Sequence, residues 1–230
     1  MNKAVKILVE IALFVAAVGL VVAIVRSVME PVNFNKQTAF RSEQAVQNLK
    51  DIRTLQVAYK SVNNKFVSTV DSLIEFYNKG QMSIIMQVGS QDDSLAMAHT
   101  EAIKKSKKGI TAAQLYDLYK AGDKHLVFSV ETKVNVKDTL FHSRENFDIN
   151  SLKYIPYSDG EEVEMEAVTK LVSGVQVPLF EARMPYKKLL KGLNEQQRIN
   201  LDDDCKQKNR YPGLQVGSIS APNNNAGNWE

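Results

Sequence analysis

The sequence predicts an α+β fold, because three patterns of apolar residues follow one another along its 230 residues. The first is an almost uninterrupted apolar stretch at residues 7–25. In the second, apolar residues recur at steps of three and four, which is typical of an amphipathic helix; they are Ala45, Leu49, Ile52, Leu55, Tyr59 and Val62. From residue 126 onwards apolar and polar residues alternate, which indicates strands of an antiparallel sheet.

Residues 7–25 are predicted to form a transmembrane helix. At 1.5 Å per residue they span about 28 Å, close to the thickness of the hydrocarbon core of a bilayer. The residues that follow lack the small-x-small pattern of a signal-peptidase site, so we expect an uncleaved anchor. Lys3 and Lys6 precede the helix. The positive-inside rule therefore places residues 1–6 in the cytoplasm and residues 26–230 beyond the inner membrane, in the periplasm of a Gram-negative cell.

Two features of this helix exceed what anchoring needs. Small side chains at spacings of 4, 3 and 4 form a stripe that another helix can approach closely; they are Ala12, Ala16, Gly19 and Ala23. The only ionisable residue of the span, Glu10, lies about 160° around the helix from Ala12. Glu10 either pairs with Lys6 at i, i+4 or is a functional intramembrane carboxylate, which neutralises a partner's charge or takes part in proton movement.

After a linker at residues 26–39, which contains the helix breaker Pro31, the sequence predicts one soluble domain at residues 40–221. Ser173 and Gly174 are typical of a two-residue hairpin turn. The predicted helices lie at residues 40–62, 70–79, 94–105, 111–121 (with Thr111 as N-cap), 186–192 and 195–203. The predicted strands lie at residues 82–88, 126–136, 162–172, 175–183 and, at a sheet edge, 214–219. We expect the polar tail at residues 222–230 to pack back onto the fold through the only tryptophan, Trp229; the alternative is a peptide offered to a partner.

The segment Glu10–Val25, EIALFVAAVGLVVAIV, resembles the N-terminal segment of type IV pilins and pseudopilins, in which a Glu opens an apolar helix. The corresponding residues are Glu10, Val15, Ala16, Gly19, Ala23 and Ile24. The stretch NLKDIRTLQVAYKSVNNKF also resembles the pseudopilin pattern of a helix with an Ala-x-Tyr pair near its end. The resemblance covers residues 7–66 and implies a pilin-like architecture, in which the membrane helix continues into an amphipathic helix packed on an antiparallel sheet. The prepilin cleavage site is not matched, because Val5 stands where pilins carry Gly or Ala.

The sequence contains no recognisable catalytic motif, so we expect neither an enzyme nor a cofactor. His99, His125 and His142 are isolated in sequence, and we expect none of them to bind a metal. The run at residues 202–204 is acidic enough to attract calcium, but two neighbouring lysines favour a solvated charge cluster. Other charged runs are predicted to be solvated faces; they are Glu161, Glu162, Glu164 and Glu166, and Lys104, Lys105, Lys107 and Lys108.

The amino-acid composition bears on nucleic-acid binding and on disulfide formation. The 29 basic and 26 acidic residues are interspersed, which argues against nucleic-acid binding. The single cysteine, Cys205, cannot form an intramolecular disulfide, so we expect a buried free thiol, with an intermolecular bridge as the alternative.

The sequence therefore favours a structural or interaction subunit of a larger envelope assembly, such as a secretion, gliding or TonB-type energised complex. The predicted partners are other inner-membrane helices, periplasmic proteins of the same complex and the lipid bilayer, and the sequence leaves a homo-oligomer open. The alternatives are a true pseudopilin that polymerises into a filament and a membrane-tethered periplasmic enzyme.

Overall fold

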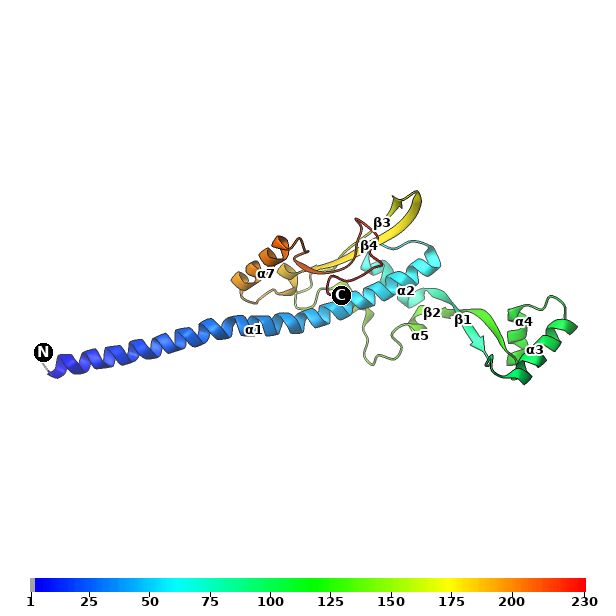
Figure 1. Cartoon of the computed structure of the whole chain (residues 1–230), viewed down its shortest axis with the longest axis horizontal. Helices are drawn as coiled ribbons and strands as arrows, with labels where there is room; N and C mark the ends of the chain where they lie inside the picture. The colour runs from blue at the N-terminus through cyan, green and yellow to red at the C-terminus, as the bar shows by residue number, and fades with distance from the viewer. Residues whose placement is uncertain (1–2) are drawn as a thin grey trace. The chain divides into compact units, whose positions relative to one another are not determined.

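The computed structural model describes residues 3–230, apart from the side chains of residues 3–6 and 9, and it has an α+β fold (Figure 1). A long N-terminal apolar helix is followed by shorter helices and two small antiparallel sheets. The helices are α1 (Lys3–Asn63), α2 (Val70–Lys79), α3 (Ser94–Ser106), α4 (Ala112–Lys120), α5 (Val136–Thr139), α6 (Tyr186–Leu189) and α7 (Glu195–Gln207), with a 3-10 helix at Ile149–Lys153. The strands are β1 (Gln81–Val88), β2 (Phe128–Asn135), β3 (Glu164–Val172), β4 (Val175–Pro185) and β5 (Gly213–Gly217).

Helix α1 continues without interruption through Pro31. The linker expected at residues 26–39 and the helix break expected at Pro31 are therefore wrong. A proline inside a helix removes one hydrogen bond, here to the carbonyl of Ser27, at a cost of about 3 kcal/mol. Packing beyond the proline outweighs this cost, because side chains such as Leu49 and Ile52 are completely buried and each contributes about 1.5–3 kcal/mol.

The chain folds as two compact units that share α1. The first unit comprises the described chain up to Thr54 together with Asn150–Glu230, and the second comprises Leu55–Ile149. The residues expected to form one soluble domain, 40–221, are thus distributed over both units.

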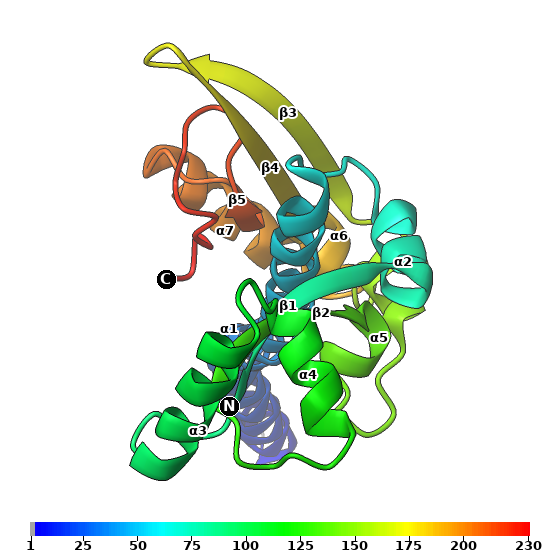
Figure 2. The same cartoon turned by 90° about the vertical axis from the view of Figure 1, so that its right-hand side faces the viewer.

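The first unit contains the three-stranded antiparallel sheet, in the order β3-β4-β5. Strands β3 and β4 are joined by the predicted two-residue turn, in which Ser173 and Gly174 both have positive φ angles, 51° and 82°, as a type I′ hairpin turn requires. Strand β5 pairs only with Glu181–Pro185 of β4. The tip of the β3–β4 hairpin therefore extends beyond β5 (Figure 2).

Within the first unit, α1 is held in place by packing and by polar contacts. Alternate residues of β4 have fully buried side chains, namely Phe180, Ala182 and Met184. The guanidinium of Arg41 on α1 donates hydrogen bonds to the carbonyl oxygens of Leu189 (3.1 Å) and Lys191 (2.8 Å). The helix is thus held against the α6–α7 region by backbone acceptors, which any sequence in that loop provides.

The second unit is built on the antiparallel pair of β1 and β2, which packs on α3 and α4. Its core consists of Val88, Leu115, Leu126, Phe128 and Val130. The predicted N-cap Thr111 is confirmed: its side chain accepts from the backbone N–H of Gln114, and the Gln114 side chain accepts from the N–H of Thr111. This reciprocal pair satisfies two donors that the start of α4 would otherwise leave free.

Most of the other predicted elements are present with shifted ends. Helix α7 extends to Gln207, whereas α6 is a single turn that ends at Leu189, and β2 begins at Phe128. Neither α5 nor the 3-10 helix was expected, because segments of four or five residues are too short to show a helical period.

Candidate functional site

The N-terminal half of α1 carries apolar side chains that nothing in the described structure covers. Large exposed apolar residues extend from Ile7 to Val32. The exposed fractions of Leu8, Leu13 and Phe14, for example, are 67%, 65% and 70%. The helix is long and apolar enough to span a membrane, with a mean hydropathy of 2.6 in its most apolar window. The first buried side chain beyond this segment is Phe34, at 6% exposure.

The predicted small-residue stripe lies within this exposed segment. All four residues are exposed, namely Ala12, Ala16, Gly19 and Ala23, and a β-carbon added to Gly19 would meet no atom within 4 Å. The stripe is therefore open to a second helix. Glu10 is also exposed, and its expected ion pair involves the Lys6 side chain, which lies outside the described residues.

The C-terminal tail pairs with β5 through an isolated β-bridge and flanking hydrogen bonds. Val216 forms an antiparallel bridge with Gly227. The N–H of Asn228 donates to the carbonyl of Gln215 (2.9 Å), and the Asn228 side-chain amide donates to the carbonyl of Gly213 (2.9 Å). The tail therefore covers an edge of the sheet that would otherwise expose unpaired backbone groups.

Two contacts hold the end of this tail. The Arg53 guanidinium on α1 lies 2.6 Å from the Glu230 carboxylate, and this pair lowers the pKa of Glu230. A β-carbon on Gly227 would overlap the Trp229 ring, so the indole packs directly on the Gly227 backbone. Trp229 also lines a groove of about 720 Å³ with α1 residues from Ala39 to Lys50. We call residues 225–230 with Arg53 the tail clasp.

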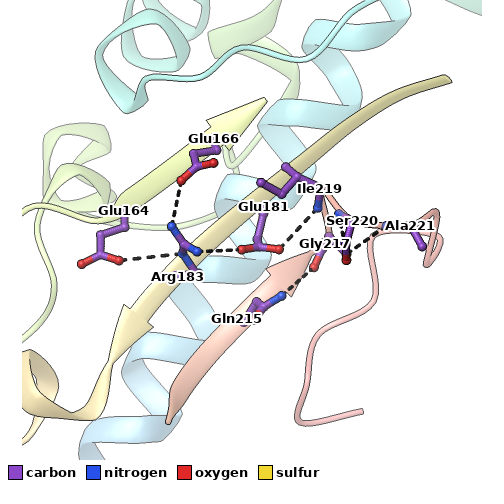
Figure 3. Close-up of polar contacts among 10 residues, drawn as sticks. Glu164, Glu166, Glu181, Arg183, Gln215, Gly217, Ile219, Ser220 and Ala221 are labelled. Carbon is purple, nitrogen blue, oxygen red and sulfur yellow. Dashed lines mark hydrogen bonds and ion pairs between the residues drawn. The ribbon is translucent and has the colours of Figure 1, made fainter. Parts of the chain in front are cut away.

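A charged cluster occupies the face of the sheet shown in Figure 3. The Arg183 guanidinium lies 2.9 Å from Glu166, 3.1 Å from Glu181 and 3.8 Å from Glu164. Glu181 is 8% exposed, and its second oxygen accepts from the backbone N–H of Ile219 at 3.3 Å. Arg183 therefore connects β3 with β4, and Glu181 connects β4 with the segment after β5.

The charges of this cluster act on neighbouring groups. Burial first, and then the negative charge of Glu164, raises the pKa of Tyr211 to about 12. A hydrogen bond from Lys188 to Glu164, at 3.0 Å, raises the pKa of that lysine. Tyr211 thus stays a neutral phenol and Lys188 a cation at any physiological pH. The cluster pairs carboxylates with cations on one face of the sheet, and neither Tyr211 nor Lys188 is activated as a nucleophile by it.

The sequence placed Glu164 and Glu166 on a solvated strand face and missed their partner. Identifying that partner requires the strand register, and the Ser173-Gly174 turn in the sequence is the signal that defines this register. A two-residue hairpin that pairs Val172 with Val175 also places Glu164 opposite Arg183, as observed.

The remaining candidate residues lie apart from one another. Cys205 is a half-buried free thiol, and burial raises its pKa. Asp202 pairs with Arg198 at 2.5 Å, whereas Asp203 and Asp204 pair with exposed lysines at the C-terminal end of α7, Lys206 and Lys208. His99 lies 2.8 Å from Asp123, whose pKa it lowers by hydrogen bonding. No group of three or more metal-ligating side chains occurs within residues 3–230 as described.

The tail clasp can be tested through Trp229, because it is the only tryptophan in the chain. Replacing Gly227 with alanine inserts a methyl group where the indole packs, which costs about 1–3 kcal/mol. We expect the fluorescence emission of Gly227→Ala to shift to longer wavelength and carboxypeptidase to remove the tail faster. Gly19→Ala, where an added β-carbon meets no atom within 4 Å and the backbone is helical, is the control, and unchanged emission in Gly227→Ala would contradict the clasp.

The Arg183 cluster can be tested by a double-mutant cycle. Arg183→Gln leaves the buried Glu181 carboxylate without its cation and should lower the free energy of unfolding by about 1–3 kcal/mol. Glu181→Gln in the same background should then cost less than it does alone, with a coupling of about 0.5–3 kcal/mol. Glu166→Gln, at a carboxylate 51% exposed, should change stability by less than about 1 kcal/mol. Urea unfolding in detergent measures all four variants, and strictly additive effects would rule the coupling out.

Comparison with known proteins finds no relative of this chain. No family model, no curated protein and no solved structure matches the chain. A functional proposal for it therefore rests on its own residues.

Proposed function

We propose that this chain is a single-span membrane protein that serves as a structural or interaction subunit of a larger inner-membrane assembly. The observation that carries the proposal is the exposed apolar half of α1, which continues as one helix into a folded unit. Burying apolar surface contributes about 25 cal/mol per Å², so a bilayer is the environment that this segment fits.

The continuity of α1 favours an interaction role over simple tethering. A flexible tether requires a linker, whereas Phe34, only eight residues beyond Arg26, is already packed in the first unit. Movement or rotation of the membrane helix would therefore be transmitted to the folded unit. The open stripe at Ala16 and Gly19 provides a surface for a second membrane helix.

In the proposed topology the N-terminus is cytoplasmic and residues 26–230 lie in the periplasm. The two lysines before the span support this orientation. Secretion, gliding and TonB-type energised complexes are the assemblies to which a subunit of this kind would belong.

A second candidate is a pseudopilin that leaves the membrane to polymerise. It is favoured by one observation, that residues of a single 61-residue helix belong to the same compact unit as a three-stranded antiparallel sheet, and the resemblance of residues 7–66 implies such a combination. Sequencing the mature N-terminus separates the two candidates. A filament subunit would begin near Val5 or Lys6, whereas a permanent anchor keeps Met1.

The docking stripe is tested by adding bulk to it. Ala16→Leu with Gly19→Leu keeps the helix apolar but prevents close approach of another backbone, so we expect partner proteins to be lost from detergent pull-downs. Ala17→Leu with Val21→Leu is the matched control, because these residues lie about 130–170° around the helix from the stripe. Full partner recovery with the first pair would exclude the stripe as a docking face, and retained cellular function would favour a tethered enzyme.

A further inference from the structure

A cleft of about 530 Å³ lies where α1 leaves the proposed membrane span. One wall is α1 itself, with Arg26, Glu30 and Phe34, and the other is the α6–α7 loop at residues 192–194. The side-chain amide of Asn194 donates a hydrogen bond to Oε1 of Glu30. The same residue caps α7 by accepting from the backbone N–H of Gln197, so the loop is fixed on α1 at this level.

The depth of the cleft coincides with the lipid headgroups. If the span ends at residue 25, Arg26 lies at the edge of the hydrocarbon core, and Glu30 lies about 6 Å farther out along the helix. The headgroup layer on each side of a bilayer is about 5–8 Å thick. Arg26, Glu30 and the bound loop therefore all lie within or directly against this layer.

The charges in the cleft have the order of a zwitterionic headgroup. Residues four apart lie on one face of a helix, so the Arg26 cation and the Glu30 anion are neighbours, with the cation nearer the hydrocarbon. In phosphatidylethanolamine the phosphate is likewise nearer the acyl chains, and the ammonium follows after an ethylene bridge. Arg26 makes no ion pair with any described residue, and Oε2 of Glu30 has no partner among them. Both groups are thus available.

The surface below the cleft suits acyl chains. Ala23 lies one turn beneath Arg26 on the same side of α1, about 60° away, and it begins the open stripe of small side chains. Above it, Met29, Phe34 and Leu193 give the cleft apolar walls. A lipid whose headgroup enters the cleft would lay its chains along this stripe.

We propose that the cleft binds one molecule of phosphatidylethanolamine, with its phosphate at Arg26 and its ammonium at Glu30. The proposal rests on the proposed membrane span of α1. An anionic headgroup would meet the Glu30 carboxylate without a cation to offset it. A choline headgroup carries a cation that has no N–H to donate to Oε2. The site should therefore distinguish ethanolamine from both.

Native mass spectrometry of the full-length protein in detergent tests this preference directly. Phosphatidylethanolamine, phosphatidylglycerol and phosphatidylcholine with identical acyl chains are titrated in turn. We expect one phosphatidylethanolamine per chain, bound at least about tenfold more tightly than the other two, since a charge-assisted hydrogen bond is lost with each. Equal binding of the three lipids, or preference for phosphatidylglycerol, would overturn the proposal.

Charge-neutral variants locate the site. Glu30→Gln keeps an acceptor for Asn194 and removes only the charge, and Arg26→Gln removes the cation; each should weaken phosphatidylethanolamine binding about tenfold. Lys36→Gln, an exposed charge on α1 outside the cleft, should leave binding unchanged. Unaltered affinity in both cleft variants would place the lipid elsewhere and contradict the proposal, and circular dichroism checks that each variant keeps its helix content.

Carbonate extraction of membranes separates failure of the site from failure of the span. If wash at alkaline pH releases the protein, then α1 does not span the bilayer, and both the proposed function and the lipid site are wrong. If the protein stays in the membrane but shows no lipid preference, only the lipid site is wrong.

Discussion

Helix α1 has to satisfy two environments with one backbone. Its first half exposes a continuous apolar surface, and the side chains of Leu49 and Ile52 in its second half are completely buried. A break between the halves would let each find its environment independently. The helix instead passes through Pro31 intact, and the hydrogen bonds of the flanking turns together with the buried second half outweigh the single bond that the proline removes. The position of the folded part of the first unit relative to the exposed apolar segment follows from this continuity.

The sequence predicts the periodic elements well because their signals are local. The Ser173-Gly174 turn and the Thr111 cap each depend on residues within one turn of the chain, and both are confirmed. Pro31 was misjudged because local propensity opposes a helix there, whereas distant packing decides the outcome. The tail contacts of Arg53 could not be predicted, since 177 residues separate it from Glu230 and no local pattern encodes such a pairing.

The polar residues of the first unit are used to join segments that are far apart in the chain. Arg183 joins β3 and β4 to each other, and Arg41 and Arg53 join α1 to a loop and to the tail. Arginine suits this task because its planar group offers five donors in a fixed geometry. Most of these pairs are partly exposed, so each contributes little alone. Burial of apolar side chains supplies most of the stability. The arginine contacts favour one arrangement of the segments over others.

The faces of α1 relate the proposed membrane segment to the folded part of the first unit. Eleven residues separate Ala23 from Phe34, which is about three full turns, so the small-residue stripe and the packed side of the helix point the same way to within about 20°. A helix that docks on the stripe would therefore lie beneath the first unit, next to the α6–α7 loop. A lipid in the cleft at Arg26 and Glu30 would extend its chains over the same stripe. The two occupants compete for one surface, so a partner helix that packs there has to displace the lipid, and its net affinity is reduced by the affinity of the lipid that it replaces.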